Sequence, residues 1–220
     1  NASAKAAYDA RTSEGGVGRP FNTPFIAIYE PYSQIYDSYA GRDIWISPVY
    51  HAARAYALTD KRYGRHHAPA GTKRGMCPEV KKLRYNLNRE PAYQDLFMNY
   101  NINPIIQNRD GYVIWNQSTS YLRTSKYQDV NVVRLVLQIK RDLERELRNF
   151  IFDINDSMTW VLMNSAVNAY LGNLVASHAL NTFATKIYAT DYDISRHRVR
   201  VDIMPDPNQV IYQILLPISV

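Results

Sequence analysis

The residues of this chain most able to do chemistry are two adjacent histidines in its first half. His66 and His67 stand in a stretch rich in glycine, proline, lysine and arginine. A metal site or an acid–base pair would need a carboxylate or a thiolate at ligand spacing, and the sequence places none nearby. We therefore expect both histidines to be surface residues without a chemical role.

Four aspartates near the end of the chain are the second candidate group. They flank short apolar segments and lack the spacing of a calcium-binding loop, so we expect them to be turn and strand-edge residues: Asp191, Asp193, Asp202 and Asp206. The sequence has no glycine-rich phosphate loop, no G-x-S-x-G and no H-E-x-x-H. Its single cysteine, Cys77, excludes an intrachain disulfide and is expected to pack in the interior. We expect no catalytic residue, no bound metal, no cofactor and no small-molecule substrate.

The positive charge of the chain is concentrated in one segment. The net charge is +6, and residues 61–90 carry nine Lys or Arg against two Glu, a net of +7. Lys73 and Arg74 lie near the centre of this segment. A basic segment of this kind binds nucleic acid, binds an acidic protein, or is a solvated loop. Tyr63 and Tyr85 could stack on bases in the first case.

Apolar runs and turn signals predict a chain of short strands and helices in the first half. Ser47 followed by Pro48 predicts a capped helix that runs to about Thr59. Asp110-Gly111 between two apolar runs predicts a hairpin. We expect a loop over 60–83 and a second helix that begins at Pro91. The predicted strands are Phe25–Tyr29, Ile44–Ile46, Ile102–Ile106 and Tyr112–Trp115.

A long amphipathic helix from Asn131 to Phe150 is the clearest predicted element. Its apolar residues recur at steps of three and four over five turns, and charged residues occupy the positions between them. We expect Leu135, Ile139 and Leu143 to be core. The outward charges are candidate contacts with other subunits or with a partner protein, as are Lys73 and Arg74 in the basic segment: Arg141, Glu144, Arg145 and Arg148.

The last third of the chain predicts one more helix and three strands. Asn155-Asp156-Ser157 can cap a helix, which Gly172 is expected to bend or interrupt. Alternation with period two then predicts strands around 183–187, 199–203 and 209–216. The predicted fold class is α/β (α+β), a mixed β-sheet packed against several helices. No apolar run approaches the roughly 18 residues of a membrane span, and we expect no membrane partner.

The domain organisation follows from the same patterns. Residues 1–24 have no periodicity and contain three Gly and two Pro, so we expect a linker from preceding domains. Residues 25–220 are expected to form one core domain. Because the chain opens at Asn1 and not at Met, we expect a fragment of a longer protein.

Five stretches, in this order along the chain, form a recognisable series within roughly residues 25–216: DIWISPVYHAARAYALTD from Asp43, NINPIIQNRDGYVIWNQST from Asn101, DVNVVRLVLQI from Asp129, FIFDINDSMTW from Phe150, and VRVDIMP from Val199. Together they resemble the sheath proteins of contractile phage tails. His178 stands where that family usually has glycine before Ala-Leu.

The resemblance implies a structural subunit and not an enzyme. Such subunits stack as hexameric rings around a tail tube, attach to a baseplate, and contract to drive the tube through the host envelope. Extended arms of neighbouring subunits add strands to each other's sheets. The implied location is the virion tail, after assembly in the host cytoplasm. The alternative from the residues alone is a nucleic-acid-binding module built on residues 61–90.

Overall fold

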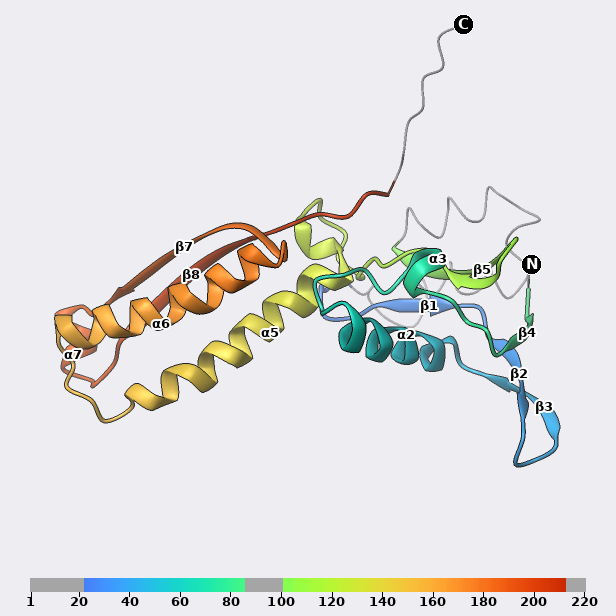
Figure 1. Cartoon of the computed structure of the whole chain (residues 1–220), viewed down its shortest axis with the longest axis horizontal. Coiled ribbons are helices and arrows are strands. Elements are labelled where there is room, and N and C mark those ends of the chain that lie inside the picture. Colours follow the sequence, from blue (N-terminus) through green and yellow to red (C-terminus); the bar gives the residue numbers. More distant parts are fainter. Residues whose placement is uncertain (1–21, 86–100, 213–220) are drawn as a thin grey trace, which may run out of the picture. The chain divides into compact units, whose positions relative to one another are not determined.

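The computed structural model describes residues 22–85 and 101–212. The helix predicted to begin at Pro91, nearly all of the predicted linker and the end of the 209–216 segment lie outside the described residues. The chain packs as two compact units, residues 1–134 and residues 135–220, and each is described by itself (Figure 1).

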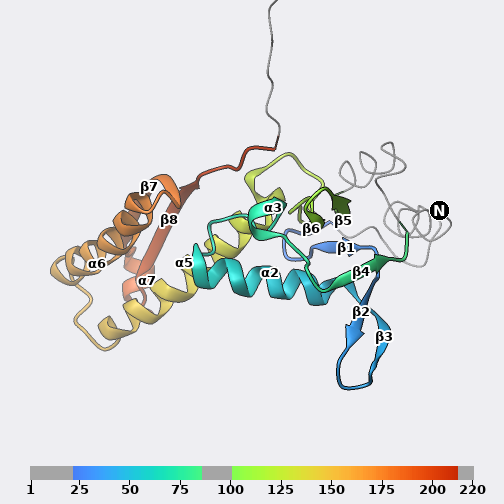
Figure 2. The ribbon, with the colours of Figure 1, turned by 45° about the vertical axis from the view of Figure 1, so that its right-hand side comes forward.

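The first unit contains two small sheets. In one, β1 (Ile28–Glu30) runs parallel to β5 (Ile102–Asn108), and β5 pairs antiparallel with β6 (Gly111–Ile114) through the predicted hairpin. In the other, the central strand β2 (Ser33–Asp37) pairs antiparallel with β3 (Arg42–Ile46) and with β4 (Val80–Leu83), as Figure 2 shows. The predicted strands at 44–46, 102–106 and 112–115 are confirmed.

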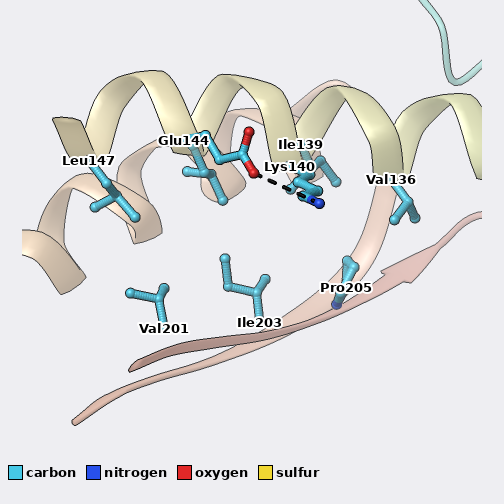
Figure 3. A pocket seen from close by; sticks show the side chains of 9 residues that line it. Val136, Ile139, Lys140, Glu144, Leu147, Val201, Ile203 and Pro205 are labelled. Atoms are coloured by element: carbon cyan, nitrogen blue, oxygen red, sulfur yellow. Dashed lines mark ion pairs between the residues drawn. The ribbon is translucent and has the colours of Figure 1, made fainter. Parts of the chain in front are cut away.

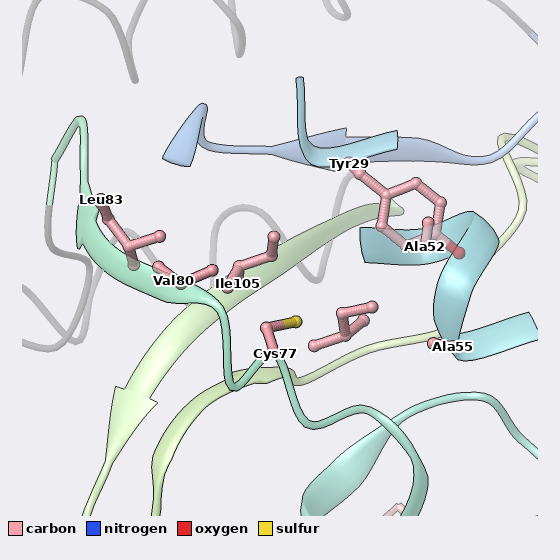
Figure 4. Close-up of a cluster of buried hydrophobic side chains, with 8 residues drawn as sticks. Tyr29, Ala52, Ala55, Cys77, Val80, Leu83 and Ile105 are labelled. Atoms are coloured by element: carbon pink, nitrogen blue, oxygen red, sulfur yellow. The ribbon is translucent and has the colours of Figure 1, made fainter. Parts of the chain in front are cut away.

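One long helix and two short ones accompany these sheets in the described part of the first unit. Helix α2 (Pro48–Arg62) begins as predicted, because Ser47 Oγ accepts a hydrogen bond from the Val49 amide. Its inner face and the sheets enclose the core shown in Figure 4: Tyr29, Ala52, Ala55, Cys77, Val80, Leu83, Ile105 and Ile114. The short helices are α3 (Gly71–Arg74) and η2 (Lys126–Gln128). Burial raises the pKa of Cys77 to about 12, and this residue packs in the interior as expected.

The loop predicted for residues 60–83 is wrong in three parts: α2 continues to Arg62, Gly71–Arg74 form α3, and the last part forms β4. Its sequence, V-K-K-L, breaks the two-residue alternation that marks a strand. The pairing with β2 shifts register between Gln34 and Ile35, so that both Val80 and Leu83 point into the core. The first predicted strand also begins later than expected, at Ile28, and Phe25 before it is largely exposed.

A buried polar network fixes the first turn of α5 (Val130–Glu146) within the first unit. Gln117 and Asn131 exchange two hydrogen bonds of 2.8 and 3.2 Å, and Asn131 Nδ2 also donates to the His66 carbonyl at 2.7 Å. One turn later, Arg134 Nη2 reaches Asp60 Oδ2 at 2.6 Å. The hydrogen bonds of Gln117 and Asn131 hold the start of the helix in a single position, whereas Asp60 Oδ1 and Arg134 Nη1 are buried without a hydrogen-bond partner.

In its described residues, the second unit combines a two-stranded sheet with two long helices and two short ones. After α5 come η3 (Leu147–Phe150), α6 (Ser157–Ala176), β7 (Leu180–Tyr188), α7 (Asp191–Ile194) and β8 (Arg200–Pro207). Strands β7 and β8 pair antiparallel over nearly their whole length. The inward side chains of α5, α6, β7 and β8 share one core that includes Leu135, Ile139, Leu143, Val167, Leu171 and Leu180, with Phe183, Ile187, Val201 and Ile203 at its margin.

Three predictions for the second unit need correction. The long helix is α-helical to Glu146 and narrows to a 3₁₀ turn over Leu147–Phe150. Helix α6 runs through Gly172 without a break, because a mid-helix glycine costs only about 1 kcal/mol and the flanking leucines pack against the core. Residues 209–212 form no strand, since Asn208 turns the chain by bonding the carbonyls of His178 and Ala179.

The inward face of α5 is predicted to determine the stability of the second unit. Ile139 is buried between α5, α6 and the sheet, so Ile139→Ala should lower the free energy of unfolding by about 2–5 kcal/mol. The matched control is Leu137→Ala, two residues away and 44% exposed, which should cost less than about 1 kcal/mol. Chemical denaturation measures both. Equal losses would contradict the assigned faces of the helix.

At the end of α6, one substitution is predicted to increase the free energy of unfolding. His178 adopts the left-handed conformation, with φ of 58°, while its amide and that of Ala179 close the helix end. Glycine adopts this conformation without steric cost, so His178→Gly should raise the free energy of unfolding by about 0.5–1 kcal/mol. His178→Ala is the control and should give no gain. A loss of stability in the glycine variant would show that the imidazole itself is needed.

Candidate assembly surfaces

Strand β8 is the element of the second unit best placed to accept another chain. Among the described residues its sheet has two strands, so β8 has β7 as its one partner strand. A sheet edge of this kind can pair with an added strand. Pro205 and Pro207 lie within β8, and proline in a sheet is confined to edges and bulges because it lacks an amide donor.

An apolar groove of about 310 Å³ runs between α5 and β8 (Figure 3). Lys140 and Glu144 stand on the α5 side, where their side-chain charges pair at 3.8 Å. The other lining side chains are apolar: Val136, Ile139, Leu143, Leu147, Val201, Ile203 and Pro205. A groove beside a strand edge can receive alternate side chains of an extended segment, while the edge supplies hydrogen bonds.

The turn before β8 is held by a buried carboxylate. Asp193 accepts hydrogen bonds from Arg200 Nε at 2.7 Å and Nη2 at 3.1 Å, and from Thr190 Oγ1 at 2.6 Å. The hydrogen bonds from Arg200, with that from Thr190, hold the pKa of Asp193 well below its usual range. The carboxylate therefore stays ionised into acid. The predicted turn aspartate is thus the residue that fixes where β8 begins.

The outer face of α5 carries the four predicted contact residues of the second unit. Arg141, Glu144, Arg145 and Arg148 are all exposed. Arg145 approaches Asp142 at 3.8 Å, and exposed pairs of this kind contribute about 0–1 kcal/mol to folding. The fold therefore has little need of these charges, which leaves them available for contacts with another chain.

Lys73 and Arg74, the other two predicted contact residues, lie on α3 in the first unit. Lys73 is exposed, whereas Arg74 Nε donates to the Ala68 carbonyl at 2.8 Å and its guanidinium lies over the ring of Tyr63. Arg74 is thus held within its own unit.

Other members of the basic segment are engaged in the same way. Arg65 pairs with Asp60 at 3.4 Å and Lys81 with Asp43 at 2.6 Å. The hydroxyl of Tyr85 donates to Glu30 at 3.2 Å, so this ring is not presented for base stacking. These contacts remove part of the charge and one of the aromatics on which a nucleic-acid interface was predicted.

The two adjacent histidines are half-buried, not surface residues as expected. Their ring centroids lie 4.2 Å apart. Burial, followed by the charges of His67 and Arg74, lowers the pKa of His66, and burial followed by the charge of Arg74 lowers the pKa of His67. Across residues 22–85 and 101–212, no group of three or more His, Cys, Asp or Glu side chains could hold a metal ion. In the same described ranges, no helix combines the length and apolarity needed to cross a bilayer.

Sequence reasoning missed the groove because its walls come from distant segments. Val136 and Val201 are 65 positions apart, and their proximity depends on how β8 returns along α5. The one available signal was Pro205 and Pro207, which follow directly after the strand predicted around 199–203, because proline next to a strand favours an edge.

Comparison with known protein families finds a match that includes the second unit. The family model described as the phage tail sheath C-terminal domain matches residues 123–220. Residues 123–220 thus resemble phage tail sheath C-terminal domains. The match includes the whole second unit and the last residues of the first, and it confirms the resemblance noted from the sequence.

Curated tail sheath proteins extend the similarity beyond that domain. The chain is 29% identical over 154 residues to the tail sheath protein of Vibrio phage KVP40, covering 70% of the chain and 23% of the relative. It is 26% identical over 151 residues to that of Enterobacteria phage T4, covering 68% and 23%. The chain thus spans about a quarter of the length of these relatives.

Solved structures of contractile sheaths share the fold. The contracted helical sheath of the anti-feeding prophage superposes with a TM-score of 0.79 at 20% identity, covering 94% of this chain and 59% of that one. The contracted sheath complex of the extracellular contractile injection system PVC gives 0.78 at 23%, covering 99% and 60%. These likenesses confirm the predicted α+β fold class.

Proposed function

We propose that the chain is the core region of a structural subunit that polymerises as stacked rings around a tail tube and contracts. One observation carries this proposal: among the described residues, the matched domain contains a two-stranded sheet with a proline-bearing edge strand beside an apolar groove. A surface of that form needs an extended segment to complete it. The curated relatives are named tail sheath proteins, which agrees with a role in assembly.

In this proposal, the partner of β8 is an arm of a neighbouring sheath subunit. An added strand would bond the edge of β8 and place alternate side chains in the groove between α5 and β8. Such a joint tolerates movement of the donor subunit, because the arm can turn outside the sheet while its strand stays paired. Neighbours linked this way can change their relative orientation during contraction without separating.

The charged face of α5 has a second role in the proposal, as a contact that can be released. Arg141, Glu144, Arg145 and Arg148 would meet the tail tube or another subunit, together with Lys73 and Arg74 from the first unit. Charged rim contacts affect the rate and specificity of association more than its strength. Such charged contacts suit an interface that dissociates when the sheath contracts.

The remaining expectations follow from the same role. The subunit would occupy the virion tail after assembly in the host cytoplasm, with residues 25–220 as its core and a baseplate as a further partner. The solved baseplate of the anti-feeding prophage contains a chain of this fold, with a TM-score of 0.79 at 20% identity. No enzymatic step is required, since the work of contraction resides in packing between subunits.

Charge reversal on α5 separates assembly from folding. We expect the full-length wild-type subunit to form tubes visible by electron microscopy. Arg141→Glu combined with Arg145→Glu should leave the melting temperature nearly unchanged, because both side chains are exposed, and should impair assembly around the tube.

The matched control for this variant is Lys126→Glu, an exchange on η2 of the first unit that lies off this face. Normal sheaths from the double variant would contradict the assignment of this face. A full-length wild-type subunit that forms no polymer under any condition would contradict the proposed function itself.

A further inference from the structure

Helix α6 differs from α5 in having no charged residue. The twenty residues Ser157–Ala176 include no Asp, Glu, Lys, Arg or His. A helix that is uncharged all round is normally covered on every side. Its inner face is covered, since Met163, Val167 and Leu171 are buried. Its opposite face is exposed over the described structure.

The exposed face of α6 follows one stripe along the helix. Met158, Val161 and Leu162 are each more than half exposed and stand at helical spacing. Small or uncharged residues continue the stripe towards the end of the helix: Ser165, Ala169, Asn173 and Ala176. An apolar stripe of this kind needs a partner surface.

The segment before α6 extends this apolar surface. Ile151 and Ile154 are exposed, and Phe152 is exposed over its whole side chain while its backbone has φ of 80°. A bulky residue in this conformation is strained. With about 100–200 Å² for each large side chain, the surface exceeds the few hundred Å² at which exposed apolar area on a monomer indicates an interaction site.

The segment is held in place and does not depend on a partner for its shape. Asp156 caps α6 by accepting from the Thr159 amide at 2.8 Å, and Trp160 Nε1 donates to Asn155 Oδ1 at 2.8 Å. Asn155 Nδ2 in turn reaches the Arg198 carbonyl at 3.3 Å. Phe152 is therefore presented from a preorganised loop, which reduces the entropy lost on binding.

We propose that this α6 surface, made of Ile151, Phe152, Ile154, Met158, Val161 and Leu162, is a permanent interface with a second sheath subunit. The inference rests on the proposed function. A face without charge cannot compensate a charged group of its partner, so the opposing surface must be apolar as well. Permanent interfaces between copies are the more hydrophobic class, whereas a contact with the tube must be broken when the sheath contracts.

In this proposal, α5 and α6 form two different kinds of contact. The charged face of α5 suits a contact that is released, and the uncharged face of α6 suits one that persists through contraction. Because rings and helices of identical subunits use heterologous contacts, the opposing surface is a different patch of the neighbouring copy.

Site-specific photo-crosslinking in the assembled full-length protein tests this assignment. A benzoylphenylalanine in place of Phe152 keeps an aromatic ring at a fully exposed position, so folding should be unaffected. We expect crosslinks to a second sheath subunit, with similar yield before and after contraction. Crosslinks to the tube, or none to sheath, would overturn the proposal. The same probe at Arg141 reports on the α5 face separately, so failure there concerns only the proposed role of α5.

A second measurement uses polymerisation of the full-length subunit without the tube. Leu162→Gln keeps the helix and removes apolar area, so the critical concentration should rise about tenfold, as loss of one buried leucine predicts. Leu122→Gln, a half-exposed leucine of the first unit, is the control and should change it less than about twofold. Equal effects of the two substitutions would overturn the proposal. If the wild type forms no polymer, the proposed function fails instead.

Discussion

The sheet of β7 and β8 keeps its shape because one of its faces packs on the apolar seams of α5 and α6. Two strands alone are marginal in water. Phe183, Ile187, Val201 and Ile203 stabilise the hairpin by reaching the core that contains Ile139 and Leu171. The Asp193–Arg200 pair adds a fixed start for β8. The four apolar side chains lie on one face of the hairpin, and the edge of β8 and the groove are the places proposed above for another chain.

The surfaces around this core differ in a way that folding alone does not require. The outer face of α5 carries charges that contribute little to the stability of the unit, and α6 carries none at all. A monomer would gain solubility from charges on both helices. The contrast agrees with the two contacts proposed above, one released and one retained on contraction.

The sequence was most informative where a single element determines its own pattern. The cap at Ser47-Pro48, the Asp110-Gly111 hairpin and the spacing of Leu135, Ile139 and Leu143 each predicted an element that the structure contains. Errors arose where tertiary contacts override local pattern. Strand β4 depends on a register shift in its partner, and the packing of Leu171 keeps α6 continuous through Gly172.

The candidate site was predicted less well, because its walls come together only when β8 folds back along α5. The charged residues of α5 could be named from periodicity, whereas the groove joins segments some 60 residues apart. The uncharged stretch Ser157–Ala176 could be read directly from the sequence, yet its meaning depends on knowing that one face is exposed.

Hydrogen exchange along β8 tests most directly whether this sheet is completed by another chain. The measurement compares the full-length subunit before and after polymerisation, at the β8 amides that do not bond to β7. We expect their exchange to slow by at least about a hundredfold on assembly, as an added strand withdraws them from water. Unchanged exchange at these amides in well-formed sheaths would contradict the account.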